Sequence, residues 1–285
     1  MKTRVPVVKT LKLFIGGAFA RSESGRTYAL ESPGTHINVA LASRKDVRDA
    51  VAAARAAWLG WSARSAYNRG QILYRLAEIM ESRREQFEDC LRLAGRQRVA
   101  AAREFESSVD LVVWYAGWCD KIEQAFSTKN PVSGPHFNVS SPEPTGVVGV
   151  IAPVAPGLLG LASAVLPALC GGNTVVAIAS ESDPMTAVAF AEAIATCDLP
   201  SGVLNVLTGS RETTAPHLAA HMDVNALSFW DCDAALAERM QIAAIENVKR
   251  VRVYGVDGIA RADTWSPHRI LDFMEIKTVW HPAGV

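Results

Sequence analysis

The feature that most constrains the fold is a run of strand, helix and strand between residues 147 and 179. Residues 147–152 and 174–179 are short, apolar and rich in β-branched side chains. The segment between them, residues 158–169, is rich in Ala and Leu and long enough for about three helical turns. Apolar strands on either side of an apolar helix are typical of a βαβ unit in a parallel sheet covered on both faces. The pattern predicts an α/β fold, and any doubly wound α/β domain satisfies it equally.

The alternation of strands and helices continues towards the C-terminus. We expect helices at residues 184–196 and 233–246, and strands at residues 224–229 and 248–254. Strands that alternate with helices in this way favour a parallel sheet. Before the central run, residues 100–124 are expected to form one long helix whose aromatic residues face the core.

The composition excludes several classes of function. Lys+Arg and Asp+Glu both number 29 in 285 residues, so the formal net charge is zero. No basic excess indicates a nucleic acid or an anionic membrane, and the apolar runs are too short to span a bilayer. The N-terminal residues make a poor signal peptide, so we expect a cytoplasmic protein. The five cysteines and six histidines show no metal-ligand spacing, so we expect no metal and no disulfide framework.

Three motifs resemble the coenzyme-binding core of the aldehyde dehydrogenase superfamily. They are Gly-Val-Val-Gly-Val-Ile-Ala-Pro at 146–153, Gly-Gly-Asn-Thr-Val-Val at 171–176, and Leu-Pro-Ser-Gly-Val-Leu-Asn-Val-Leu-Thr-Gly at 199–209. The resemblance implies a Rossmann-like parallel sheet, as in the coenzyme-binding domain of that family. It also implies a small β-element that bridges subunits.

The same resemblance implies a plan of domains. Residues 1–258 would form a degenerate coenzyme-binding domain, with an oligomerisation hairpin at about residues 126–146. Residues 259–285 would form a connector and a bridging strand, because Glu-Ile-Lys-Thr-Val-Trp at 275–280 resembles the family's C-terminal strand. The family's catalytic domain, which carries a Gly-Gln-x-Cys segment with the nucleophile, has no counterpart. We expect that domain to be absent through an internal deletion.

Two further catalytic positions of the family are replaced. In the family, a cysteine thiolate attacks the aldehyde, an Asn stabilises the oxyanion and a Glu activates water. Ala155 stands at the position of the Asn, and Tyr254 at the position of the Glu. The loss of an oxyanion donor costs about 3 kcal/mol in the transition state, and a phenol with a pKa near ~10 is a poor base at neutral pH. We therefore expect no catalytic residue in the chain.

The resemblance also implies a damaged coenzyme site. The family Lys that meets the adenosine ribose is Ile178 here, and the loop that receives the pyrophosphate carries Trp230 and Asp231 in place of Thr and Gly. A bulky ring and a carboxylate keep phosphates away from a helix N-terminus. The positions that survive are vestigial coenzyme-binding residues: Pro153, Ser180 and Glu181. We expect no cofactor, or at most weak binding of NAD or NADP.

Nearly the whole chain resembles the truncated, non-catalytic second half of the two-domain aldehyde dehydrogenase family sixteen. In that family the truncated half packs on a complete dehydrogenase half. We therefore expect a structural or regulatory subunit that docks on a complete NAD(P)-dependent aldehyde dehydrogenase by β-augmentation. Its interface would include Phe137, Val139, Ile276, Val279 and Trp280. Two alternatives stay open: a small NAD(P)-binding oxidoreductase with an unrecognised site, and a homo-oligomeric scaffold.

Overall fold

The described part of the chain, residues 10–32 and 35–283 of a computed structural model, is built on a central mixed sheet. Its seven strands lie in the order β12-β11-β8-β9-β10-β2-β3. The strands from β12 to β10 run parallel to one another, whereas β2 and β3 are antiparallel additions at one edge. The bounds are β2 (Leu13–Ile15), β3 (Ala18–Ala20), β8 (Val147–Ile151), β9 (Thr174–Ile178), β10 (Leu204–Leu207), β11 (Ala226–Trp230) and β12 (Arg250–Tyr254).

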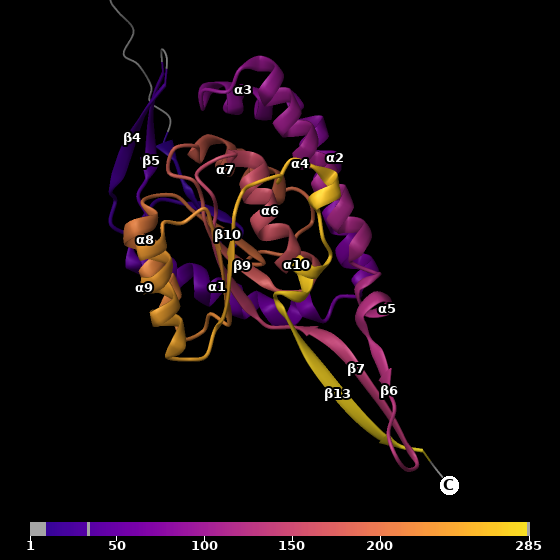
Figure 1. Cartoon of the computed structure of the whole chain (residues 1–285). Helices are drawn as coiled ribbons and strands as arrows, with labels where there is room; N and C mark the ends of the chain where they lie inside the picture. The colour runs from indigo at the N-terminus through magenta and orange to yellow at the C-terminus, as the bar shows by residue number, and fades with distance from the viewer. Residues whose placement is uncertain (1–9, 33–34, 284–285) are drawn as a thin grey trace, which may run out of the picture.

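Helices cover both faces of this sheet, as Figure 1 shows. One face carries α1 (Arg44–Ser62), α8 (Arg211–Ala219) and α9 (Ala234–Ile245). The other carries α2 (Ala66–Ser82), α3 (Arg84–Leu93), α4 (Arg98–Trp118), α6 (Gly157–Cys170) and α7 (Pro184–Ile194). The result is a three-layer α/β/α arrangement, and the predicted α/β fold with a parallel sheet is confirmed.

Strand β8 shows why its sequence is apolar at every position. Val147 and Ile151 belong to the cluster under α1, whereas Val148 and Val150 belong to the cluster under α6. Because successive side chains of a strand point to opposite faces, a sheet covered on both faces needs apolar residues at both parities.

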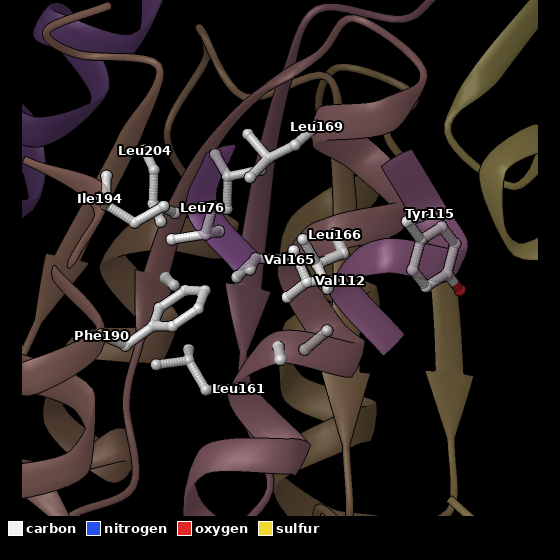
Figure 2. Packing of buried hydrophobic residues seen from close by; sticks show 14 of the residues in the cluster. Leu76, Val112, Tyr115, Leu161, Val165, Leu166, Leu169, Phe190, Ile194 and Leu204 are labelled. Carbon is white, nitrogen blue, oxygen red and sulfur yellow. The ribbon is translucent and has the colours of Figure 1, made fainter. Parts of the chain in front are cut away.

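The larger of the two clusters is filled by side chains from several helices. Figure 2 shows Leu76 of α2 and Val112 of α4 among residues of α6 and α7, with Tyr115 of α4 at the side of this group. Helix α6 is buried along its whole length, because α4 and α7 pack on it and the sheet lies beneath it. Because every side of the helix is buried, its sequence is apolar all round rather than amphipathic.

Among the described residues, two smaller three-stranded sheets stand beside the main one. The first has the order β1-β5-β4 and contains β1 (Thr10–Leu11), β4 (Thr27–Ser32) and β5 (Thr35–Ala40). The second, here called the β arm, has the order β13-β7-β6. It contains β6 (Thr128–Asn130), β7 (His136–Pro144) and β13 (Met274–Pro282), and it projects away from the body (Figure 1). Strand β13 pairs antiparallel with β7 along its whole length, so distant parts of the sequence form one sheet.

Some boundaries differ from the predicted ones for local reasons. The expected helix at 100–124 is interrupted: α4 ends at Trp118, a turn follows, and α5 (Ile122–Phe126) is a separate short helix whose Phe126 stacks on Trp118 with ring centroids 6.4 Å apart. Strands β11 and β12 each begin two residues later than predicted. The backbone N–H groups of Val224 and Val248 instead close turns onto His221 and Ile245. Beyond β12 the chain forms a 3-10 turn at Ala262–Thr264 and the short helix α10 (His268–Leu271).

Candidate functional site

The three predicted coenzyme-binding residues lie at the carboxyl edge of the central sheet. Pro153 follows β8, while Ser180 and Glu181 follow β9. Because β8 and β9 pair in parallel, these loops meet at one edge, which is where open α/β sheets bind ligands. The hydroxyl of Ser180 donates a hydrogen bond of 2.8 Å to the carbonyl of Val154. Ser180 therefore ties the two loops together.

Glu181 and Pro153 have structural neighbours of their own. The Glu181 side chain is exposed, and its backbone carbonyl accepts a hydrogen bond of 3.1 Å from the Tyr28 hydroxyl of β4. Burial, and secondarily the charge of Glu181, raise the pKa of Tyr28. The ring of Pro153 lies directly over Gly160, where a Cβ would meet it at 2.4 Å. Only a glycine at that position of α6 leaves room for the loop.

Arg211, which was not predicted from the sequence, lies beside these loops at the carboxyl edge of the sheet. It is the first residue of α8, and its guanidinium donates to the carbonyls of Ala152, Trp230 and Asp231, the last at 3.1 Å. These carbonyls end β8 and β11, so one side chain spans two neighbouring strands. An arginine in the first turn opposes the helix dipole, and that unusual placement was the available sequence signal.

The loop after β11 is closed by its own side chains. The Trp230 ring is buried, lies 4.7 Å from the Tyr254 ring between centroids, and donates through Nε1 to Ser228 at 2.9 Å. Asp231 adopts a φ of +48°, in the left-handed region. The carboxylate of Asp233 accepts a hydrogen bond of 2.8 Å from the N–H of Leu236 and caps α9. The N-terminus of α9, which the family resemblance places opposite a pyrophosphate, thus already has an anionic cap.

Tyr254, at the end of β12, is held by the C-terminal segment. Its hydroxyl donates to Asp272 at 2.7 Å, and the Asp272 carboxylate also accepts from Arg252 at 2.7 Å. Burial, followed by the hydrogen bond to Asp272, raises the pKa of Tyr254. The guanidinium of Arg269 lies 5.2 Å from the centroid of the Trp230 ring and 5.7 Å from that of Tyr254. The phenol is therefore a neutral hydrogen-bond donor inside a stack of side chains.

Ala155 lies beside a second group of charged residues. It lines a cleft of about 700 Å³ together with Pro156, Arg103 and Glu104. The buried Glu104 carboxylate accepts from the N–H groups of Leu158 at 3.0 Å and Leu159 at 3.4 Å. It thereby caps α6, which has no side-chain cap of its own.

Two partners complete this group at the start of α6. Arg96 donates to the second oxygen of Glu104 at 3.1 Å. The carboxylate of Asp183 lies against Gly157, the first residue of α6. Burial, reinforced by the charge of Glu104, raises the pKa of Asp183 to about 6, although hydrogen bonds from Thr186 oppose the shift. None of these long-range contacts has a local sequence signature.

Within residues 10–32 and 35–283, no three His, Cys, Asp or Glu side chains come together in an arrangement that could hold a metal ion. In the described part of the chain, none of the helices combines the length and the apolar character needed to cross a lipid bilayer.

Comparison with known proteins gives one family. Residues 19–254 match the model described as "Aldehyde dehydrogenase family". The chain is 34% identical over 248 residues to cytosolic 10-formyltetrahydrofolate dehydrogenase of Mus musculus, covering 84% of this chain and 28% of that protein. It is 34% identical over 258 residues to aldehyde dehydrogenase, cytosolic 1, of Elephantulus edwardii, covering 86% of this chain and 50% of that protein.

Solved structures agree with this result. PnpE from Pseudomonas sp. WBC-3 superposes with a TM-score of 0.81 at 31% identity, covering 86% of this chain and 50% of that one. The NAD+ complex of an aldehyde dehydrogenase from Bacillus cereus gives a TM-score of 0.81 at 26% identity, covering 86% and 51%. The chain therefore spans about half the length of these structures, and a smaller share of the 10-formyltetrahydrofolate dehydrogenases.

Proposed function

Because this chain belongs to the aldehyde dehydrogenase family, we propose that it is a non-catalytic homologue that serves as a structural or regulatory subunit of a complete NAD(P)-dependent aldehyde dehydrogenase. The observation that carries the proposal is the carboxyl edge of the sheet, which the chain fills with its own side chains. Arg211 engages the strand-end carbonyls, and Arg269 lies over the paired rings of Trp230 and Tyr254. An edge that is satisfied internally offers few free donors to a ligand.

The residues at this edge do not fit the pyrophosphate of NAD. Backbone N–H groups at the start of α9 would have to face the phosphates, yet Asp233 caps that turn and Asp231 precedes it. Each carboxylate repels an anion, and the loss of two charge-assisted hydrogen bonds to the phosphates weakens binding by a factor of roughly a hundred to a thousand or more. The hydroxyl of Tyr254 donates its proton in a hydrogen bond to Asp272, so it is not available as a general base that activates water.

The β arm supports the docking part of the proposal. In the described part of the chain, nothing pairs with the outer edge of β13, and the side chains of residues 275–282 are exposed. An unpaired strand edge is a template for a strand of another chain. The strand presents Trp280, which is 59% exposed, so pairing there would also bury a large aromatic surface.

The predicted interface residues divide between the two faces of the arm. Because Val279 lies opposite Val139 and His281 opposite Phe137, these side chains share one face. Ile276 and Trp280 lie on the other face, by the same alternation. Both faces therefore present apolar side chains to a partner. The arm is suited to contacts with another subunit on both of its faces rather than on one face alone.

The direct test is to mix the purified full chain with complete aldehyde dehydrogenases of the same cell and to measure mass by size-exclusion chromatography with light scattering. We expect a complex of fixed ratio with at least one of them. Trp280→Glu should abolish it, whereas Tyr74→Glu should not, because Tyr74 is a comparably exposed aromatic residue on α2. A chain that stays monomeric beside every dehydrogenase offered contradicts the proposal, and assembly with itself alone would instead indicate a scaffold.

Nucleotide binding separates the subunit from an enzyme with an unrecognised site. Isothermal titration of the isolated chain with NAD and NADP is expected to show no binding at millimolar concentration. Binding with a Kd in the micromolar range would remove the argument from the filled edge and favour the oxidoreductase.

A further inference from the structure

Two cysteine thiols lie against each other near the root of the β arm. Cys119 follows the last turn of α4, and Cys170 is the last residue of α6. Their sulfur atoms are 3.4 Å apart, and both side chains are buried. Both sulfurs also lie within hydrogen-bond distance of the carbonyl of Tyr115, at 3.5 Å and 3.2 Å. The two thiols are free, and the distance between their sulfur atoms is only about 1.4 Å longer than the S–S bond of a disulfide.

Both side chains are buried, but of the two only Cys119 lines a pocket. This partly open pocket of about 420 Å³ lies between α1, α2 and β7 and also includes Arg69 and Glu143. Burial and the hydrogen bond with Cys119 raise the pKa of the Cys170 thiol well above its usual range, although the nearby guanidinium of Arg69 opposes the shift. A small oxidant in this pocket therefore lies next to Cys119, and local opening of the surrounding side chains would expose its thiol.

We propose that Cys119 and Cys170 form an oxidation site, at which a peroxide converts the two thiols into a disulfide that joins the ends of α4 and α6. The proposal is independent of the subunit function. In the first step, the Cys119 sulfur, having lost its proton, attacks one peroxide oxygen. The O–O bond breaks, the released hydroxide takes up a proton to become water, and Cys119 becomes a sulfenic acid.

In the second step the sulfur of Cys170 attacks the sulfur of Cys119. The S–O bond breaks, and hydroxide leaves and takes the proton of the Cys170 thiol, which gives a second water. In total the two thiols lose two electrons and two protons, and the peroxide is reduced to two waters. The raised pKa of Cys170 slows this step, but the separation of 3.4 Å makes the attack effectively unimolecular.

The disulfide would constrain a large part of the chain. Cys119 and Cys170 are 51 positions apart in the sequence, and the loop between them contains β6, β7 and most of α6. Closing a loop of this length restricts the unfolded chain, and we expect the thermal midpoint to rise by about 5–10 °C.

The test exposes the reduced full chain to hydrogen peroxide and maps its peptides by mass spectrometry without reduction. We expect a cross-linked peptide that joins Cys119 to Cys170, a loss of two hydrogens in mass, and a raised thermal midpoint. Dithiothreitol should reverse all three. Cys119→Ala and Cys170→Ala should each abolish the cross-link and the shift, whereas Cys197→Ala, at another buried cysteine, should keep both.

Peptide mapping of the wild-type chain decides the question even where a variant folds poorly. The proposal is overturned if peroxide leaves both thiols open to alkylation after unfolding. It is equally overturned if Cys119 ends as a sulfinic acid, or if the cross-link joins either residue to Cys232.

Discussion

The carboxylate of Glu104 on α4 accepts a hydrogen bond of 3.0 Å from the backbone N–H of Leu158, in the first turn of α6. One carboxylate thus caps a helix distant in sequence and joins the helical layer to the loop that follows β8. Its negative charge complements the positive end of the helix dipole, and Arg96 partly neutralises it. The loop that holds Pro153 and Ala155 depends on this contact for its position.

Replacing Glu104 with Ala should therefore destabilise the chain by about 2–3 kcal/mol, since a cap is worth about 1 kcal/mol and the loss of one partner of a buried pair costs more. Arg96 is partly exposed and can regain water, which limits the effect. Glu104→Gln keeps an acceptor and should cost only about 1 kcal/mol. Urea unfolding measures both variants, and Glu106→Ala, on the exposed side of α4, should change stability by less than about 0.5 kcal/mol. Equal effects of the three changes would contradict this role.

Asp183 gives a prediction for pH dependence. Its folded pKa of about 6 lies above the unfolded value of about 3.9, so the folded state binds the proton more tightly. This favourable contribution is complete below pH ~4 and is lost as pH rises through ~6, by up to about 3 kcal/mol. Asp183→Asn removes the charge and keeps an N-cap acceptor for Thr186.

The variant should therefore be more stable than the wild type at pH 8, and the difference should shrink towards pH 5. The free energy of unfolding, measured in urea at both pH values, gives the difference between the two proteins. A difference that does not change with pH would show that Asp183 titrates normally. As a control, Asp49→Asn on the exposed side of α1 should give no pH-dependent difference of this size.

Structural features that depend on a local sequence pattern could be predicted, whereas those that depend on contacts between distant residues could not. The central βαβ unit was predictable because burial on both faces makes β8, β9 and α6 continuously apolar. The positions of Pro153 and Ser180 followed from parallel strands, whose carboxyl ends must share one edge. The hairpin of β4 and β5 was missed.

The side chains that fill the candidate site could not be predicted in the same way. Arg211 reaches a carbonyl 59 positions away, and Glu104 reaches an N–H 54 positions away. Asp272 meets Tyr254 only because the chain returns past the end of β12. The family resemblance predicted an altered site, but it did not indicate that these side chains occupy this edge.

Arg211 should contribute to stability rather than to binding. Arg211→Ala removes the donor to the carbonyls of Ala152, Trp230 and Asp231, which should cost about 1–3 kcal/mol. Part of the loss is offset, because a cation in the first turn of α8 opposes the helix dipole by about 0.3–1 kcal/mol. Arg239→Ala, which breaks only the exposed pair with Glu212, is the control and should cost less than about 0.5 kcal/mol. If Arg211→Ala and Arg239→Ala were equally stable in urea, the hydrogen bonds from the Arg211 guanidinium to the strand-end carbonyls would not be stabilising the fold.

A substitution at Tyr254, which the family resemblance predicts at the general-base position, tests whether this residue is structural. Tyr254→Phe removes only the hydroxyl that donates to Asp272, and should lower the free energy of unfolding by about 1 kcal/mol. Because its pKa is raised, the phenol stays neutral, so this loss should be the same at pH 6 and pH 9. Tyr67→Phe, at an exposed tyrosine of α2, should have no measurable effect.

A double-mutant cycle of Tyr254→Phe with Asp272→Asn measures the interaction between the two side chains. We expect the coupling free energy to account for most of the stability lost in Tyr254→Phe. If instead the cost of Tyr254→Phe grew between pH 6 and pH 9, the folded pKa of the hydroxyl would lie below its unfolded value, and the position would again qualify as a base.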